Sequence, residues 1–155
     1  MNGGGWHIHA VGGRLNPHLD YSIHPKLGLQ RKINLIVYLR KDWKESWGGQ
    51  LGMWKAKDAG GPGVLKVTVT PQFNRAVLFD TTMDSWHGLI GAVTCPEGHY
   101  RKSIALYYLT DPPPGTDPRG KAFFYPTKEQ EGDQGVLDLI KTRATVAGAN
   151  SVYKR

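Results

Sequence analysis

The feature that most constrains the fold of this chain is a series of short β-branched and aromatic stretches separated by glycine and proline. With 20 glycines and 10 prolines in 155 residues, turns are frequent. The clearest stretch, residues 32–39, is almost continuously apolar, as in a strand that is buried on both faces. The ranges that read as strands are 6–11, 14–21, 32–39, 50–55, 64–69, 75–80 and 99–109. This pattern predicts a mainly β fold, either a sandwich or a barrel.

The end of the chain carries a different pattern. Val136, Leu139, Ile140 and Ala144 recur at helical spacing after a cap at Asp133, and Gly148 suits a helix stop. We expect this helix to pack on the outside of the sheet, without a catalytic role. The predicted organisation is a β core over residues 1–127, followed by a helix and a polar tail over residues 128–155.

Composition restricts the cellular context. No run of 18 apolar residues is present, and the N-terminus lacks the basic-then-apolar layout of a signal peptide. Cys95 is the only cysteine, so no disulfide can form within the chain. A reducing compartment is the expected location, and we predict a cytoplasmic protein that does not enter a membrane.

The chain is basic, with 20 Lys and Arg against 13 Asp and Glu. The basic residues are scattered, with no dense run beyond pairs such as Arg31-Lys32 and Lys154-Arg155. Scattered charge is typical of a solvated surface, so a nucleic-acid partner is not expected.

Two histidines and one aspartate stand out as a candidate metal site. His18 and Asp20 are two residues apart, so on a strand both side chains would project from the same face. His87 follows the strand-like range 75–80 and could return to the same cavity. Alone, a His-x-Asp pair is more often an ordinary hydrogen-bonding pair. Two histidines and one carboxylate together form the ligand set of non-haem Fe(II) centres, which leaves coordination positions open for oxygen chemistry. The remaining histidines, His7, His9, His24 and His99, lack a partner at ligand spacing, and we expect them to be structural or exposed.

A second group of polar residues lies on the last predicted strand. Arg101 and Ser103 share a face with Tyr107, and on the clearest strand Asn34, Ile36 and Tyr38 share a face. A buried arginine must be paired, and its planar fork suits a carboxylate. The residues therefore favour a carboxylate anchor. Lys102 as the anchor, or a solvated basic strand end, are the alternatives.

With these residues in view, the chain resembles the Fe(II)- and 2-oxoglutarate-dependent oxygenases, in particular the prolyl 4-hydroxylase-like branch. The resemblance covers roughly residues 3–127. The matching motifs are Gly12-Gly13-Arg14-Leu15 before His18-Leu19-Asp20; Asn34-Leu35-Ile36-Val37-Tyr38-Leu39 followed by Lys41-Asp42-Trp43 and Gly48-Gly49-Gln50-Leu51; Phe73-Asn74-Arg75-Ala76-Val77-Leu78-Phe79; and Arg101-Lys102-Ser103.

The resemblance implies a double-stranded β-helix, or jelly roll. It implies that His18, Asp20 and His87 bind Fe(II), and that Arg101 and Ser103 bind the distal carboxylate of 2-oxoglutarate. The other residues that it places against the cosubstrate are Tyr38, Asn34, Ile36 and Leu51. The implied reaction hydroxylates an unactivated C–H bond, of a prolyl or other protein side chain first, and converts 2-oxoglutarate and O₂ to succinate and CO₂. Ascorbate binding is part of the same expectation.

Three departures from the family pattern have consequences. Only 17 residues precede His18, where relatives carry a longer N-terminal region, so a sheet edge could be covered by a partner chain or by self-association. Residues 93–98 lengthen the path from His87 to Arg101. Tyr107 stands where related hydroxylases often have a tryptophan, which predicts a different substrate pocket.

Other functions remain open on the sequence alone. A cupin-like metal enzyme would use three histidines and a glutamate, which the chain does not offer at the expected spacing. A non-catalytic jelly roll could bind sugars through its tryptophans, which are Trp6, Trp43, Trp47, Trp54 and Trp86. Within the oxygenases, the substrate could instead be a free amino acid or a surface sugar. The loops at 22–31 and 55–63 are the segments expected to face it.

Overall fold

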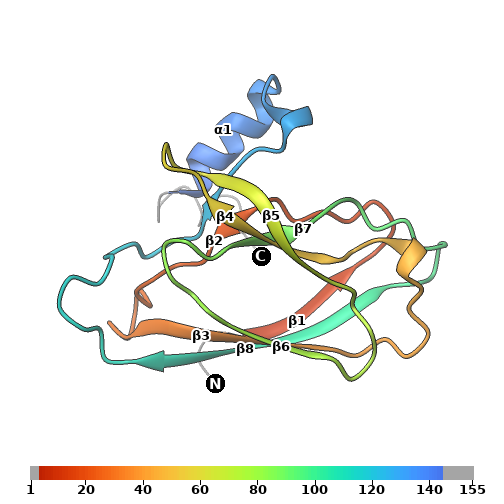
Figure 1. The fold of residues 1–155 in the computed structure, drawn as a ribbon, viewed down its shortest axis with the longest axis horizontal. Helices are drawn as coiled ribbons and strands as arrows, with labels where there is room; N and C mark the ends of the chain where they lie inside the picture. The colour runs from red at the N-terminus through yellow and green to blue at the C-terminus, as the bar shows by residue number, and fades with distance from the viewer. Residues whose placement is uncertain (1–3, 145–155) are drawn as a thin grey trace.

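The computed structural model describes residues 4–144 as two antiparallel β-sheets packed face to face (Figure 1). One sheet has the order β1-β8-β3-β6 and the other has the order β5-β4-β7-β2-β9. The strands are β1 (Gly4–His9), β2 (His18–Leu19), β3 (Gln30–Tyr38), β4 (Leu51–Ala56), β5 (Pro62–Val69), β6 (Ala76–Asp80), β7 (Trp86–Leu89), β8 (Arg101–Thr110) and β9 (Phe123–Phe124). The helices are η1 (Glu45–Trp47), η2 (Lys128–Gln130) and α1 (Gln134–Arg143). The predicted mainly β jelly roll with a C-terminal helix is confirmed.

The interior between the sheets is built from alternate residues of β3 and β8. Ile36, Tyr38 and Ala105 are buried and contact Leu51 of the opposite sheet. Because side chains alternate across a strand, the same alternation sends Arg101 and Ser103 into this interior. The apolar core therefore continues directly into a polar region between the two sheets.

A second buried cluster closes one end of the sandwich. Leu89, Val93 and Cys95 pack together, with Leu15, Trp43 and Trp47 against them. Trp86 is also buried, whereas Trp6 is largely exposed. Most of the tryptophans therefore contribute to packing and do not form one sugar-binding surface.

The strand expected over residues 14–21 is wrong in extent, because β2 contains only His18 and Leu19. Pro17 has no N–H to donate, and Leu15 and Gly13 instead accept hydrogen bonds from the amides of Leu89 and Val93. The segment before His18 therefore runs irregularly beside β7. The short strand β9, which pairs with β2, was not expected from the sequence.

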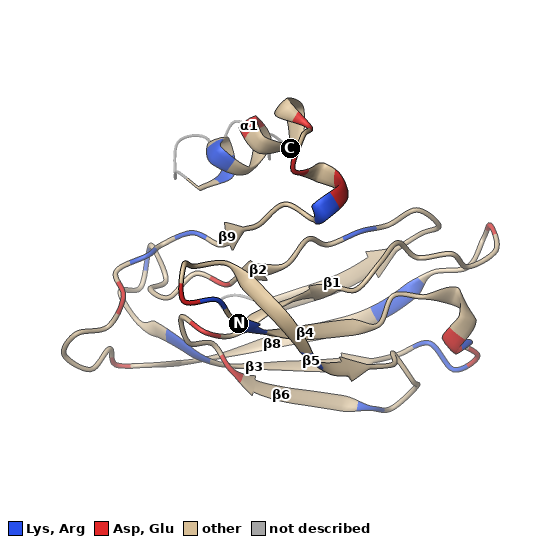
Figure 2. Ribbon diagram, turned by 45° about the horizontal axis from the view of Figure 1, so that its top comes forward, with Lys and Arg blue, Asp and Glu red and all other residues tan. Residues whose placement is uncertain are grey.

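The C-terminal helix begins where the sequence predicts. The carboxylate of Asp133 accepts a hydrogen bond from the amide of Val136, as an N-cap does. In Figure 1 the helix α1 lies outside the five-stranded sheet, and it contacts β9, which is labelled in Figure 2. Gly148, the predicted stop, lies outside the described residues, and the division at residue 127 stays a prediction.

Figure 2 shows that lysines and arginines occur on strands, loops and α1, among acidic residues. The described basic residues thus do not form one continuous patch on the ribbon. No helix within residues 4–144 is long and apolar enough to cross a membrane.

Candidate metal centre and anchor recess

The two candidate histidine ligands face each other across paired strands. His18 of β2 is the direct register partner of His87 of β7, and the centroids of the two rings lie 4.3 Å apart. Both side chains are buried. The antiparallel register therefore brings together two residues that are far apart in the sequence.

Backbone carbonyls orient both rings. The Nδ1 atom of His18 lies 3.0 Å from the carbonyl oxygen of Asn16, and the Nδ1 atom of His87 lies 2.8 Å from that of Ser85. Because a carbonyl oxygen only accepts hydrogen bonds, each Nδ1 carries the proton and each Nε2 keeps a free lone pair. This is the tautomer that binds a metal through Nε2.

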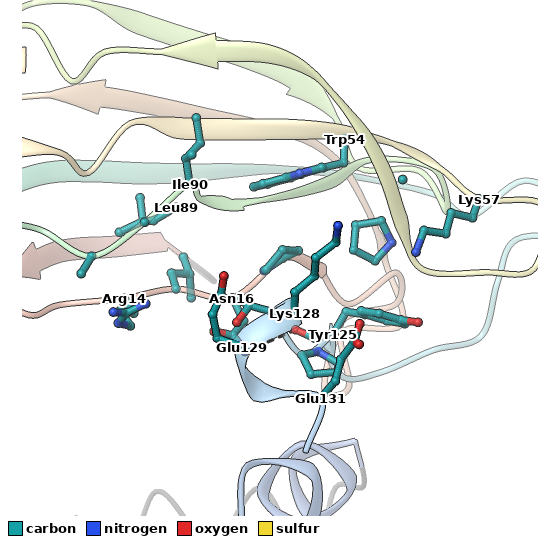
Figure 3. A pocket seen from close by; sticks show the side chains of 18 residues that line it. Arg14, Asn16, Trp54, Lys57, Leu89, Ile90, Tyr125, Lys128, Glu129 and Glu131 are labelled. Carbon is teal, nitrogen blue, oxygen red and sulfur yellow. Dashed lines mark hydrogen bonds between the residues drawn. The ribbon is translucent and has the colours of Figure 1, made fainter. Parts of the chain in front are cut away.

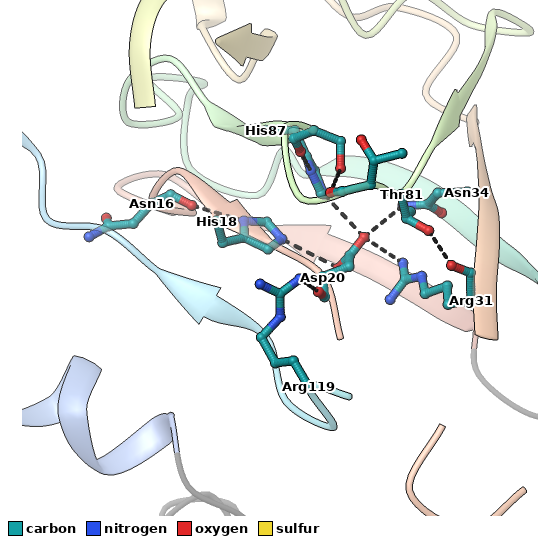
Figure 4. A network of polar contacts seen from close by, with 10 residues as sticks. Asn16, His18, Asp20, Arg31, Asn34, Thr81, His87 and Arg119 are labelled. Carbon is teal, nitrogen blue, oxygen red and sulfur yellow. Dashed lines mark hydrogen bonds and ion pairs between the residues drawn. The ribbon is translucent and has the colours of Figure 1, made fainter. Parts of the chain in front are cut away.

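Asp20 completes the cluster (Figure 4). One carboxylate oxygen, Oδ2, lies 3.4 Å from Nε2 of His87, and the other, Oδ1, lies 3.7 Å from Nε2 of His18. A donor atom from each of the three residues lies within 4.8 Å of the others. Two imidazole nitrogens and one carboxylate at this separation fit a single divalent ion such as Fe(II).

Arg31 is a partner of Asp20 that the sequence did not reveal. Its guanidinium lies 2.8 Å from Oδ2 of Asp20 and 3.3 Å from the centre of the Tyr107 ring. A register shift between Arg31 and Ile33 turns Arg31 inward together with Asn34, although simple alternation would place them on opposite faces. The inward position of Arg31 therefore depends on a β-bulge, which strand alternation in the sequence does not indicate.

Charge holds the cluster in the protonation state that a metal requires. Burial raises the pKa of Asp20, but the contacts of its carboxylate with His87, together with the charge of Arg31, outweigh burial and hold the pKa below its ordinary value. Burial and the neighbouring His87 lower the pKa of His18 to about 3. At neutral pH the structure therefore presents a carboxylate and a neutral imidazole.

The backbone around Asp20 is also fixed. Arg119 donates a hydrogen bond to the carbonyl oxygen of Asp20 at 3.1 Å, and the hydroxyl of Thr81 donates to the carbonyl oxygen of Arg31 at 2.6 Å. Arg119 lies in a segment without periodic pattern, so its contact with Asp20 could not be inferred from the sequence.

Arg101 is a buried cation without an acidic partner in the described part of the chain. Its side chain donates through Nε to the carbonyl oxygen of Gly49 at 2.7 Å, and one terminal nitrogen lies 3.4 Å from the hydroxyl of Ser103. Its guanidinium lies 5.1 Å from the centre of the Tyr38 ring. Burial lowers the pKa of Arg101, although an arginine remains charged. Because a buried charge without a partner is costly, the guanidinium of Arg101 is a candidate binding group for an anion.

The Tyr38 hydroxyl is a further unsatisfied group. It is buried beside Arg101 and has no hydrogen-bond partner among the residues that the structure describes. Burial raises the pKa of the Tyr38 hydroxyl, and the charge of Arg101 opposes part of this rise. Asn34, Ile36 and Leu51, the other residues expected at the cosubstrate, are all buried in the same interior. Lys102 belongs to the opposite face of β8 and is less buried than Arg101, so the geometry favours Arg101 as the anchor.

Gly49 permits the close approach of Arg101. It has a φ of 71°, and a Cβ atom at this position would lie 2.8 Å from Cδ of Arg101. A side chain at Gly49 would therefore strain the backbone and displace the guanidinium.

A separate cavity of about 740 Å³ lies between the five-stranded sheet and the segment around η2 (Figure 3). Its lining includes Trp54, Tyr125, Lys57 and Lys128. Its lining includes none of the three candidate ligands and not Arg101, so it is separate from the candidate metal and anchor residues. Lys57 and Pro62, from the loop expected to face the substrate, line this cavity instead.

With this geometry established, comparison with known proteins identifies the family. The model of the 2OG-Fe(II) oxygenase superfamily matches residues 5–109, which is more than half of the chain. The chain belongs to this superfamily. The predicted resemblance to Fe(II)- and 2-oxoglutarate-dependent oxygenases is confirmed, and the similar proteins that follow are prolyl hydroxylases.

A curated relative, Prolyl 3-hydroxylase OGFOD1 of Xenopus laevis, is 30% identical over 91 residues, which cover 56% of this chain and 17% of the relative. A solved structure of prolyl 4-hydroxylases from Phytophthora capsici has a TM-score of 0.50 at 22% identity, covering 96% of this chain and 45% of that one. A prolyl hydroxylase from Trichoplax adhaerens has a TM-score of 0.50 at 21% identity, covering 69% of this chain and 44% of that one. These structures support the fold, and the chain spans about half of their length or less.

Proposed function

We propose that this protein is an Fe(II)- and 2-oxoglutarate-dependent hydroxylase that acts on a C–H bond of a prolyl or other protein side chain. The observation that carries the proposal is that one interior holds both three metal-type donors and an unpaired buried arginine. The donors fit a ferrous ion, and the arginine fits the distal carboxylate of a diacid. Family membership supports the same pairing of iron with 2-oxoglutarate.

In this proposal His18, Asp20 and His87 hold the iron. The carbonyls of Asn16 and Ser85 keep the Nε2 lone pairs directed at it. Arg31 binds Oδ2 of Asp20, which leaves Oδ1 available and favours a single oxygen donor from this carboxylate.

Arg101 and Ser103 hold the distal carboxylate of 2-oxoglutarate, and the Tyr38 hydroxyl gains a partner. Bound iron with 2-oxoglutarate and O₂ supplies the oxidation, in which one oxygen atom enters the C–H bond and the other enters succinate as CO₂ leaves. The buried walls, including Ile36 and Leu51, exclude water from this reaction.

A peptide substrate is supported by the name of the curated relative, a prolyl 3-hydroxylase. The Trichoplax adhaerens enzyme is described in complex with a peptide fragment of the hypoxia inducible factor oxygen degradation domain. Tyr107, stacked beneath Arg31, would contribute to a pocket unlike one that contains tryptophan. Use of ascorbate stays a prediction.

The test measures succinate formed by the purified protein with Fe(II) and 2-oxoglutarate, with and without a chelator and with and without ascorbate. We expect slow metal-dependent succinate formation without substrate, and faster formation with a library of proline-containing peptides. Mass spectrometry should then find the gain of one oxygen atom on a peptide. Absence of metal-dependent succinate would contradict the oxygenase proposal. Succinate formation that responds only to free amino acids or sugars would contradict the peptide substrate alone.

A further inference from the structure

Two histidines that are not part of the metal cluster lie beside the candidate anchor residues Arg101 and Ser103 on the neighbouring strand. His7 and His9 lie on β1, the strand beside β8 in the four-stranded sheet. In the register, His7 is the partner of Ser103 and His9 is the partner of Arg101. Both are partly buried, whereas Trp6 and Ile8 between and beside them are exposed, so the histidines occupy the inward face of β1.

His9 has an unsatisfied polar atom at the same corner as Arg101. Its Nδ1 is buried and has no hydrogen-bond partner among the described residues, as is also true of the Tyr38 hydroxyl. Gly13 leaves room for the side chain, because a Cβ there would lie 2.9 Å from Cβ of His9. One corner thus contains an unpaired cation and two unsatisfied polar groups.

The charge state of His9 suits an anion that is already bound by arginine. Burial, followed by the charges of Arg101 and His7, lowers the pKa of His9 to about 4. The ring is therefore neutral at physiological pH, with one N–H to donate. A neutral donor adds a hydrogen bond without repelling the adjacent guanidinium.

Building on the proposed function, we propose that His9 is a cosubstrate-binding residue that donates a hydrogen bond to the same carboxylate that Arg101 binds. Because His9 is the register partner of Arg101, its ring would also help to set the length of diacid that fits between Arg101 and the metal. The expected order of preference is 2-oxoglutarate over the shorter oxaloacetate and the longer 2-oxoadipate.

The experiment compares wild type with His9→Phe, which keeps a ring but no hydrogen bond, and His9→Gln, which keeps a donor. His99→Gln is the matched control, because that histidine packs against Trp47 and not beside Ser103 or Arg101 in the register. Calorimetry measures 2-oxoglutarate binding in the presence of Mn(II), and succinate formation gives KM and kcat separately.

We expect His9→Phe to weaken binding and raise the KM by about 10- to 100-fold, as for losing a hydrogen bond to a charged group, with kcat changed much less. His9→Gln should stay within a few-fold of wild type, and His99→Gln should match it. His9→Phe should also bind oxaloacetate and 2-oxoadipate with less discrimination. A folded His9→Phe protein with wild-type affinity would overturn the role of His9.

A second measurement does not depend on a variant that folds. In wild type labelled with ¹⁵N-histidine, the His9 ring resonances should move when 2-oxoglutarate is added with Zn(II), and unmoved resonances at saturation would overturn the contact. Failure of wild type to bind 2-oxoglutarate with any divalent metal would instead overturn the proposed function and the inference together. The two failures are therefore distinguishable.

Discussion

The two ends of the interior differ in how their buried arginines are paired. At the metal end, the Nδ1 atoms of His18 and His87 are fixed by backbone carbonyls, and Asp20 is paired with Arg31. At the anchor end, Arg101 has no acidic partner in the described structure, and the Tyr38 hydroxyl and His9 Nδ1 are unsatisfied.

This difference indicates how each end obtains its shape. At the metal end, partners within the chain hold the three candidate donors in position. The anchor end retains a buried charge and polar atoms whose desolvation is not repaid within the protein. Its stability and its affinity should therefore depend on an anion, whereas the geometry of the metal end should depend on internal partners.

The largest effect on activity is expected when a metal donor is removed. His87→Ala should abolish metal binding. It should reduce turnover by more than the roughly 10- to 100-fold loss that is typical when a residue that only orients a metal ligand is replaced. The protein should stay folded, because its carbonyl partner at Ser85 can bind water instead. Iron content and succinate formation measure the effect, with His99→Ala as a control, because that histidine packs against Trp47 and is not part of the cluster. Full activity in His87→Ala would show that the ligand assignment is wrong.

The anchor end should respond differently to loss of its charge. Arg101→Met should raise the 2-oxoglutarate requirement by about 10- to 1000-fold, the scale of a charge-assisted pair. Without cosubstrate, the same variant should be as stable as wild type or more stable, because an unpaired buried charge is replaced by an apolar side chain. Titration of succinate formation and thermal unfolding test both effects. Lys102→Met is the matched control on the other face of β8, and a larger effect there would transfer the anchor to Lys102.

Breaking the internal pair at the metal end should instead destabilise the protein. Asp20→Ala leaves Arg31 buried without its carboxylate, at a cost of about 3–5 kcal/mol in the free energy of unfolding. The neighbouring pair of Lys32 and Asp80 is roughly half exposed, so Asp80→Ala should cost at most about 1 kcal/mol. Urea unfolding of the two variants without metal tests this contrast. Equal costs would contradict a self-organised metal end.

The sequence indicated which side chains enter the interior wherever a strand follows simple alternation. Asn34, Ile36 and Tyr38 follow strict alternation, as do Arg101 and Ser103, and each set is buried as expected. The register that brings His18 opposite His87 was less accessible, because β2 is only two residues long. The pairing there depends on contacts with β7 and β9 rather than on a local pattern.

The residues that the sequence did not reveal share a physical cause. Arg31 turns inward only because of a bulge, which local propensity does not encode. His7 and His9 alternate with Trp6 and Ile8, and the apolar residues of that strand would be expected to face the interior. Here they face outward, so hydrophobicity alone assigns the wrong face to β1. The partners of these residues lie on strands that are distant in the sequence, and the local sequence pattern does not predict which strands pair.

A smaller effect is expected from crowding the anchor end without removing its charge. Gly49→Ala places a Cβ 2.8 Å from Cδ of Arg101 and requires a non-glycine residue at a φ of 71°. We expect a stability loss of about 1–2 kcal/mol and a rise of roughly tenfold in the KM for 2-oxoglutarate. Gly98→Ala is a control with positive φ and open space around it, so it should lose stability without the change in KM. A KM that is unchanged in Gly49→Ala would mean that Arg101 can shift without losing the cosubstrate.

The smallest expected effect is on the pH dependence of stability, and it concerns the anchor end. The pKa of His9 is about 4 in the folded protein, compared with 6.5 for a histidine in the unfolded chain. Burial, followed by the charges of Arg101 and His7, disfavours the charged ring in the folded state. The unfolded chain therefore binds a proton as the pH falls below 6.5, while the folded chain does so only near pH 4. The contribution of His9 is full above about pH 6.5 and declines toward pH 4. His7, whose pKa is also lowered by burial and by Arg101, acts in the same direction.

Urea unfolding at several pH values within this window should show stability falling with acidity in the protein without ligands. His9→Gln should make that decline shallower, because the unfolded variant gains no proton at this position. Addition of 2-oxoglutarate with Mn(II) should also make the wild-type decline shallower, since a bound carboxylate offsets the charge of Arg101 beside His9. Parallel curves for wild type and His9→Gln would place His9 in an environment where its ring titrates normally. The environment of His9 would then not differ from that of an exposed histidine, and the anchor end would not disfavour a second positive charge beside Arg101.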